Sequence, residues 1–202
     1  MPRIDDYIAA RNRAAEALAA ETIEAIAKRS GFDRIDDVSM RVPFLNRTYR
    51  VSYPDFVFTD MDSDAAVPLQ EQVLILHYLI GNSPEWLKGQ WVAYREIQGA
   101  QFYYSAFIKR AVDPLKKIFG QSVQPLTAAA QNLNGRPIDA GDAGFEFLVF
   151  PKVPVQVIVY QGDDEFPAEA SILFDHSIGD ILSPEDIAWM AGMLVYRLMA
   201  LK

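Results

Sequence analysis

The chain has 202 residues, half of them hydrophobic, with a formal net charge of −8. This acidic balance argues against nucleic acid or an anionic membrane as a partner, because both require a basic protein surface. The absence of cysteine excludes disulfides, thiolate metal sites, iron–sulfur ligation by this chain and a thiol nucleophile, and two histidines cannot form a three-histidine metal site. The N-terminal sequence lacks the apolar core of a secretory signal, and no apolar run is long enough to span a membrane. We therefore expect a cytoplasmic protein.

The N-terminal part of the sequence predicts a helix, a pair of strands and a second helix. Residues 3–30 have apolar side chains at helical spacing and many alanines, and Gly31 is a typical helix stop. Residues 38–45 and 47–58 have strand composition, with a tight turn between them. Residues 68–81 begin with proline and end with glycine, as helices often do, and are apolar nearly all round, which indicates a buried helix.

The C-terminal part predicts mixed strands and helices. Residues 90–97 suit a strand, and residues 99–120 suit a helix that Pro114 breaks or restarts. Ser183 and Pro184 are strong start signals for the last helix. The remaining predicted elements are a helix at 123–135, strands at 145–150, 153–160 and 169–175, and the last helix at 183–202.

Together these elements predict an α+β fold with a mostly antiparallel sheet flanked by helices. We expect residues 1–202 to form a single α+β domain. Residues 42–80 and 153–201 share the order strand, strand, helix. A duplicated β-β-α unit is one interpretation of this similarity.

Aromatic and basic residues gather between residues 86 and 110. One interpretation is a core layer with an amphipathic rim. The other is a pocket for a flat or anionic ligand, in which aromatic faces hold the ligand and guanidinium groups pair with its carboxylate or phosphate. The candidate ligand-binding residues are Trp91, Tyr94, Arg95, Tyr103 and Arg110.

Acidic residues of the segment GDDEFP form a second candidate site. Asp163 and Glu165, together with Asp175 and His176, would suit a hard metal ion if the four side chains converged. The alternative is a solvated hairpin turn, since the spacing lacks the Asp-x-Asp-x-Asp-Gly signature of calcium loops. No Gly-x-Ser-x-Gly nucleophile turn is present, and His77 suits a buried helix position.

Three stretches of the sequence resemble an uncharacterised family, the domain of unknown function DUF3786: residues 89–120, residues 150–175 and LSPEDIAWM at 182–190. The resemblance covers about residue 10 to the end of the chain. It implies one cytoplasmic domain from anaerobic bacteria or archaea, and it implies no activity or catalytic residue. Some relatives carry a cysteine-rich, iron–sulfur-type segment, from which this cysteine-free chain departs.

Two functional hypotheses follow. The first is a non-catalytic binding or accessory module for a small anionic or flat ligand, or for a redox or cofactor protein partner in anaerobic metabolism. The second is a metal-assisted, hydrolase-like enzyme that uses the acidic hairpin residues and His176. The sequence identifies no cofactor, and a homodimer is compatible with the narrow alanine-rich stripe of the N-terminal helix.

Overall fold

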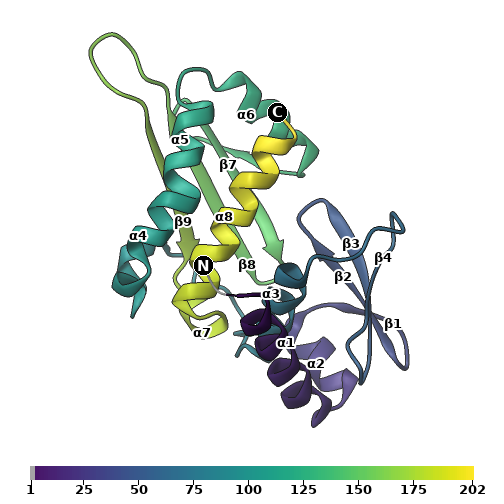
Figure 1. The fold of residues 1–202 in the computed structure, drawn as a ribbon. Coiled ribbons are helices and arrows are strands. Elements are labelled where there is room, and N and C mark those ends of the chain that lie inside the picture. The colour runs from purple at the N-terminus through teal and green to yellow at the C-terminus, as the bar shows by residue number, and fades with distance from the viewer. Residues whose placement is uncertain (1–2) are drawn as a thin grey trace. The chain divides into compact units, whose positions relative to one another are not determined.

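The computed structural model describes residues 3–202 and has an α+β fold with two antiparallel sheets, which confirms the predicted fold class (Figure 1). The chain forms two compact units. Unit 1 runs up to Glu85 and includes Asp180–Leu182, and unit 2 comprises Trp86–Gly179 and Ser183–Lys202.

Unit 1 combines three helices with a four-stranded meander in the order β1-β2-β3-β4. Its elements are α1 (Ile4–Ala19), α2 (Ile23–Ser30), β1 (Asp33–Asp36), β2 (Ser39–Phe44), β3 (Arg47–Ser52), β4 (Phe58–Asp60) and α3 (Leu69–Ile80). The α3 helix follows Pro68 and ends before Gly81, as predicted, and most of its side chains are buried.

The single helix predicted over residues 3–30 is wrong, because the structure breaks it between Ala19 and Ile23. Thr22 caps α2: its Oγ1 accepts a hydrogen bond from the Ala25 N–H at 3.3 Å. Threonine competes for backbone hydrogen bonds in this way, and a capping threonine at helical spacing resembles a stripe position.

Unit 2 contains a five-stranded antiparallel sheet in the order β5-β9-β8-β7-β6. Its strands are β5 (Trp91–Ala93), β6 (Arg136–Ile138), β7 (Ala143–Phe150), β8 (Val153–Tyr160) and β9 (Glu169–Asp175). Its helices are α4 (Tyr104–Phe107), α5 (Asp113–Phe119), α6 (Gln124–Asn132) and α8 (Pro184–Ala200). The short helix α7 (Ile178–Ile181) is divided, because its last two residues belong to unit 1. Figure 1 shows α5 and α8 across one face of this sheet.

The predicted strand over residues 90–97 is too long, because β5 stops at Ala93 and residues 94–96 form a short 3₁₀-helix. The Glu96 carboxylate accepts a hydrogen bond from the Ala93 N–H at 2.6 Å, and the Tyr94 hydroxyl donates to the Pro184 carbonyl at 2.7 Å. These two bonds turn the chain away from the sheet edge after only three strand residues.

The predicted helix over residues 99–120 contains a π-helix at Ile108–Val112, between α4 and α5. The Asp113 N–H bonds to the Ile108 carbonyl, five residues back, in place of the usual four. Pro114 explains the widening, since it has no N–H to offer to the Arg110 carbonyl four residues before it. π-Helical turns occur often at functional sites.

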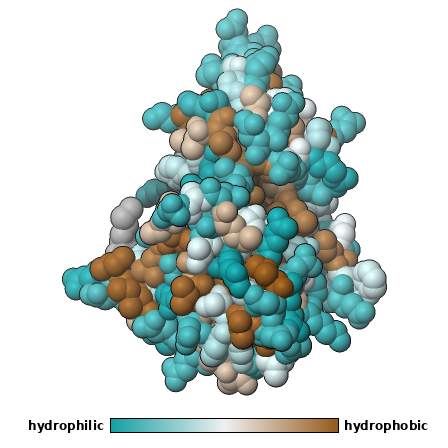
Figure 2. Space-filling view, turned by 90° about the vertical axis from the view of Figure 1, so that its right-hand side faces the viewer, coloured by the Kyte–Doolittle hydropathy of each residue, from teal (hydrophilic) through white to brown (hydrophobic). Residues whose placement is uncertain are grey.

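Most of the large apolar side chains lie in the cores of the two units, and those left exposed do not form one continuous face in the view of Figure 2. Figure 2 shows hydrophobic residues as separate patches among hydrophilic ones. None of the helices within residues 3–202 has the length and apolar character needed to cross a membrane.

Candidate functional site

A cavity of about 100 Å³ lies in unit 2 where β5 ends. Three segments supply its walls: residues 93–95 at the end of β5, residues 170–173 of β9, and four helical side chains. The helical side chains are Tyr104, Phe107, Ile108 and Val112. The π-helix begins at Ile108 and ends at Val112, so its wider turn places both ends of the segment against the cavity.

Three aromatic residues of the cavity wall and the neighbouring Phe174 form a cluster of rings. Tyr94 and Phe107 stack with their centroids 4.3 Å apart and their planes inclined by 11°. Phe174 lies 6.4 Å from Tyr94 and 6.2 Å from Phe107, in tilted or edge-on arrangements. Tyr94, Phe107 and Phe174 are buried, whereas Tyr104 is 37% exposed. The cluster is thus a core layer whose outer ring reaches the surface.

Among the described residues that line the cavity, Arg95 alone carries a charge. Its side chain is exposed, and among residues 3–202 it has no hydrogen-bond or ion-pair partner. An unpaired guanidinium next to apolar walls retains all its donors for an external acceptor.

Two tyrosines of this region are held in the neutral form. Burial raises the pKa of Tyr94, and the charges of Tyr103 and Glu185 add to that effect. The Glu185 carboxylate raises the pKa of Tyr103 by its charge and by accepting a hydrogen bond from the Tyr103 hydroxyl. Neither hydroxyl is free to act as a base, since each is committed to a residue at the start of α8.

The structure places two of the five predicted ligand-binding residues, Tyr94 and Arg95, in the cavity wall. Trp91 lies on β5 opposite Asp175, and Tyr103 binds Glu185. Arg110 lies on the α8 side of the π-helix, where its carbonyl oxygen is 3.3 Å from the position that a Cβ atom on Gly192 would take. These three residues do not line the cavity.

The sequence did not identify the β9 part of the wall. Residues 169–175 were predicted as a strand, but the side chains of 170–173 carry no chemical signature. These residues reach the cavity because β9 is the neighbour of the short strand β5 in the sheet, and this strand order cannot be read from the sequence.

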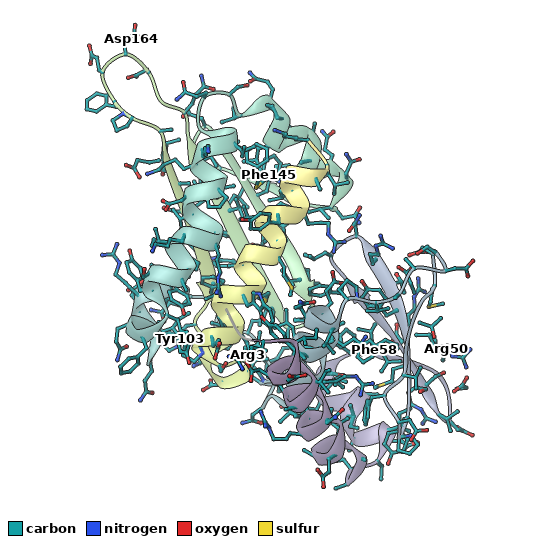
Figure 3. The ribbon with its side chains drawn as sticks, viewed as in Figure 1. Arg3, Arg50, Phe58, Tyr103, Phe145 and Asp164 are labelled. Carbon is teal, nitrogen blue, oxygen red and sulfur yellow. The ribbon has the colours of Figure 1, made fainter. Side chains whose placement is uncertain are left out.

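The four predicted metal-binding residues lie at opposite ends of β9. That strand has seven residues, which at a rise of about 3.4 Å per residue makes it roughly 20 Å long. Asp163 and Glu165 belong to the loop before β9, and Figure 3 shows Asp164 between them at the outer tip of that loop. The structure therefore does not bring the four side chains together. Within residues 3–202 no group of three or more histidine, aspartate or glutamate side chains could hold a metal ion.

Asp163 instead stabilises the loop between β8 and β9. Its Oδ1 accepts hydrogen bonds from the N–H groups of Phe166 at 2.7 Å and Glu165 at 2.8 Å. These two bonds lower the pKa of Asp163. The arrangement is that of an Asx turn, which is the architectural role the sequence allowed for this segment.

Asp175 is buried at the other end of β9 and holds the loop that leads into β5. Its carboxylate accepts hydrogen bonds from the N–H groups of Lys88 at 3.2 Å and Gly89 at 2.7 Å, and from the backbone and hydroxyl of Ser177. The neighbouring His176 is exposed, and its Nδ1 lies 3.0 Å from Lys88 Nζ. Asp175 therefore positions the start of β5, whose other end borders the cavity.

Comparison with known proteins supports the resemblance found in the sequence. A family model matches residues 22–197 and spans both units. No match was found among curated proteins or among solved structures. The chain therefore belongs to the family described as a domain of unknown function (DUF3786).

Proposed function

We propose that the protein is a binding module that holds an anionic group, a carboxylate or a phosphate, in the unit 2 cavity at Arg95. The observation that carries this proposal is the unpaired Arg95 guanidinium at a cavity whose other lining side chains, apart from Ser171, are aromatic or aliphatic. A guanidinium binds carboxylate and phosphate through two parallel hydrogen bonds, and partial exclusion of water strengthens them.

The size of the cavity narrows the class of ligand. About 100 Å³ holds roughly three water molecules, whereas sites for drug-sized ligands measure about 300–1,000 Å³. The stacked rings of Tyr94 and Phe107 leave no gap in which a flat ligand would fit between them. We therefore favour an anionic group over a flat aromatic ligand.

The composition of the wall favours binding over catalysis. Among the described residues that line the cavity there is no histidine, aspartate, glutamate or lysine. These are the side chains that most often transfer protons in enzymes. A site with one guanidinium and none of these four side chains is suited to holding a ligand.

Titration with sodium acetate and with inorganic phosphate at constant ionic strength tests the proposal. Backbone amide chemical shifts of the ¹⁵N-labelled protein should move at residues 93–95 and 170–173. Arg95→Ala should weaken binding by about 10- to 100-fold, the equivalent of a charge-assisted hydrogen bond of about 1.5–3 kcal/mol. The affinity of Arg95→Lys should lie between those of the wild-type and Arg95→Ala proteins, because lysine keeps the charge and loses the fork geometry of the guanidinium.

Arg41→Ala is the matched control, since Arg41 is another exposed arginine without a hydrogen-bond or ion-pair partner among residues 3–202. It should bind both anions like the wild-type protein. Equal affinities of the wild-type and Arg95→Ala proteins would contradict the proposal.

A further inference from the structure

The edge of the unit 2 sheet is only partly covered. β5 pairs with β9 from Trp91 opposite Asp175 to Ala93 opposite Leu173, and then turns away. Residues 170–172 of β9 continue for three positions beyond that point and pair with β8 on their other side. In the described chain no strand occupies the outer side of these three residues.

The backbone groups that face this open side follow from the hydrogen bonds of β5. The N–H of His176 donates to the Gln90 carbonyl at 2.8 Å, across the β5 side of β9. Backbone groups in an antiparallel strand alternate between its two sides. Phe174, Ile172 and Ala170 therefore direct their N–H and C=O groups to the same side as His176, and Ser171 directs its own groups to β8. Ile172 and Ala170 lie beyond the end of β5.

The cavity lies along this same open edge. Residues 170–173 line it consecutively, as expected of a strand that presents its backbone edge rather than one face. Ile108 and Val112 form the opposite wall, and Arg95 adds its positive charge at the end nearest β5. The cavity thus combines unpaired backbone donors and acceptors, an apolar wall and one cation.

We propose that the ligand is an extended acidic peptide segment of a partner protein, which adds a short strand to residues 170–172 of β9 and places a carboxylate on Arg95. This inference rests on the proposed function, and it identifies the anionic group held at Arg95 as a side-chain carboxylate of that peptide. Open sheet edges bind extended peptides through main-chain hydrogen bonds, while neighbouring pockets give specificity. The charge of Arg95 selects an acidic peptide, whose carboxylate enters the cavity of about 100 Å³ while its backbone lies along the edge of β9.

The probe is the pentapeptide acetyl-Thr-Val-Thr-Val-Asp, whose terminal aspartate fixes the register on Arg95. In the wild-type protein it should bind at least about tenfold more tightly than acetate, because it adds backbone hydrogen bonds. Two N-methylated forms carry the methyl groups on both valines or on both threonines. One form should lose at least about tenfold in affinity and the other should keep it, because alternate residues of a strand face the sheet edge.

Ala170→Pro tests the same edge from the protein side. Proline removes an N–H that faces away from β8, and sheets tolerate proline at such edge positions. This variant should weaken peptide binding at least about fivefold more than it weakens acetate binding, a difference typical of one hydrogen bond. Amide exchange reports the site directly: the peptide should slow exchange at Ala170 and Ile172, whereas Ser171 should exchange slowly with or without it.

Each outcome decides between the two proposals. If acetate binds at Arg95 but the peptide binds no more tightly than acetate, the strand-addition inference is overturned and the anion site stands. The same conclusion follows if both N-methylated forms bind with equal affinity. Failure of both acetate and peptide to bind would overturn the proposed function and the inference with it.

Discussion

Tyr94 and Phe107 stack almost in parallel, 4.3 Å between ring centroids, although Tyr94 follows a strand and Phe107 ends a helix. The pair joins the chain segment after β5 to the helix that forms the opposite wall of the cavity. Both rings are buried, so the pair stabilises unit 2 and fixes the width of the cavity at the same time.

Truncation of Phe107 should therefore be costly. Phe107→Ala removes a buried ring and its stacking contact with Tyr94, and should lower the free energy of unfolding by about 3–5 kcal/mol. Phe102→Ala is the control, because Phe102 is 81% exposed and its loss should change stability by less than about 0.5 kcal/mol. Urea denaturation followed by tryptophan fluorescence measures both, and equal losses in the two variants would contradict this role of Phe107.

Asp175 should make stability depend on pH. Burial by itself raises the pKa of its carboxyl, but the hydrogen bonds from Ser177, Gly89 and Lys88 outweigh burial and leave the pKa below its ordinary value. A carboxyl with a lowered pKa in the folded state contributes stability above its unfolded pKa of about 3.9, and the contribution disappears as the pH falls through the folded value.

Asp175→Asn should accordingly be less stable than the wild-type protein at pH 7 by about 1–3 kcal/mol. The difference should narrow as the pH falls below about 4, because the Asp175 carboxyl takes up a proton first in the unfolded chain and, at lower pH, in the folded protein. Thermal unfolding across pH 3–7 measures it, with Asp164→Asn as an exposed control. A difference that is the same at pH 3 and pH 7 would contradict the assignment.

The loop between β8 and β9 should depend on Asp163 and not on its neighbour. Asp163→Ala removes the acceptor for the N–H groups of Glu165 and Phe166, so amide exchange at these two residues should become faster. Asp164 makes no such bond within the described chain, and Asp164→Ala should leave both rates unchanged. Identical exchange in the two variants would show that the loop does not need the Asx turn.

In unit 1 the hydroxyl of Tyr49 donates a hydrogen bond of 2.5 Å to Glu71, and both residues are buried. Tyr49→Phe leaves a buried carboxyl oxygen with one donor fewer and should cost about 1–3 kcal/mol of stability. Tyr196→Phe, at a side chain that is 56% exposed, should cost little. Chemical denaturation measures the free energy of unfolding of both variants. An unchanged stability of Tyr49→Phe would contradict the importance of this bond.

The predictable part of the fold is the part that local chemistry determines. α8 begins where Ser183 and Pro184 predict it, and the Ser183 hydroxyl accepts a hydrogen bond from the Asp186 N–H. α3 begins and ends at its proline and glycine. The errors lie where a side chain redirects the backbone, as Thr22 does between two helices and Glu96 does at the end of β5.

The candidate site was only half predictable, because part of it is backbone. The side-chain chemistry of Tyr94 and Arg95 predicts a role for both, and both line the cavity. The β9 edge and the π-helix wall depend on strand order and on the effect of Pro114 on the helix before it. Arg110 was chosen for its charge, but its position in the π-helix directs it toward α8.

The most direct test of the anion site observes the Arg95 guanidinium itself. The Nε–Hε resonance of Arg95 in ¹⁵N-labelled protein can be followed during titration with acetate and phosphate, with the Arg41 signal as an internal reference. The anion site predicts that the Arg95 resonance shifts in a saturable way and exchanges more slowly with water, while Arg41 responds only weakly and without saturation. Equal and unsaturable responses of the two arginines would contradict it.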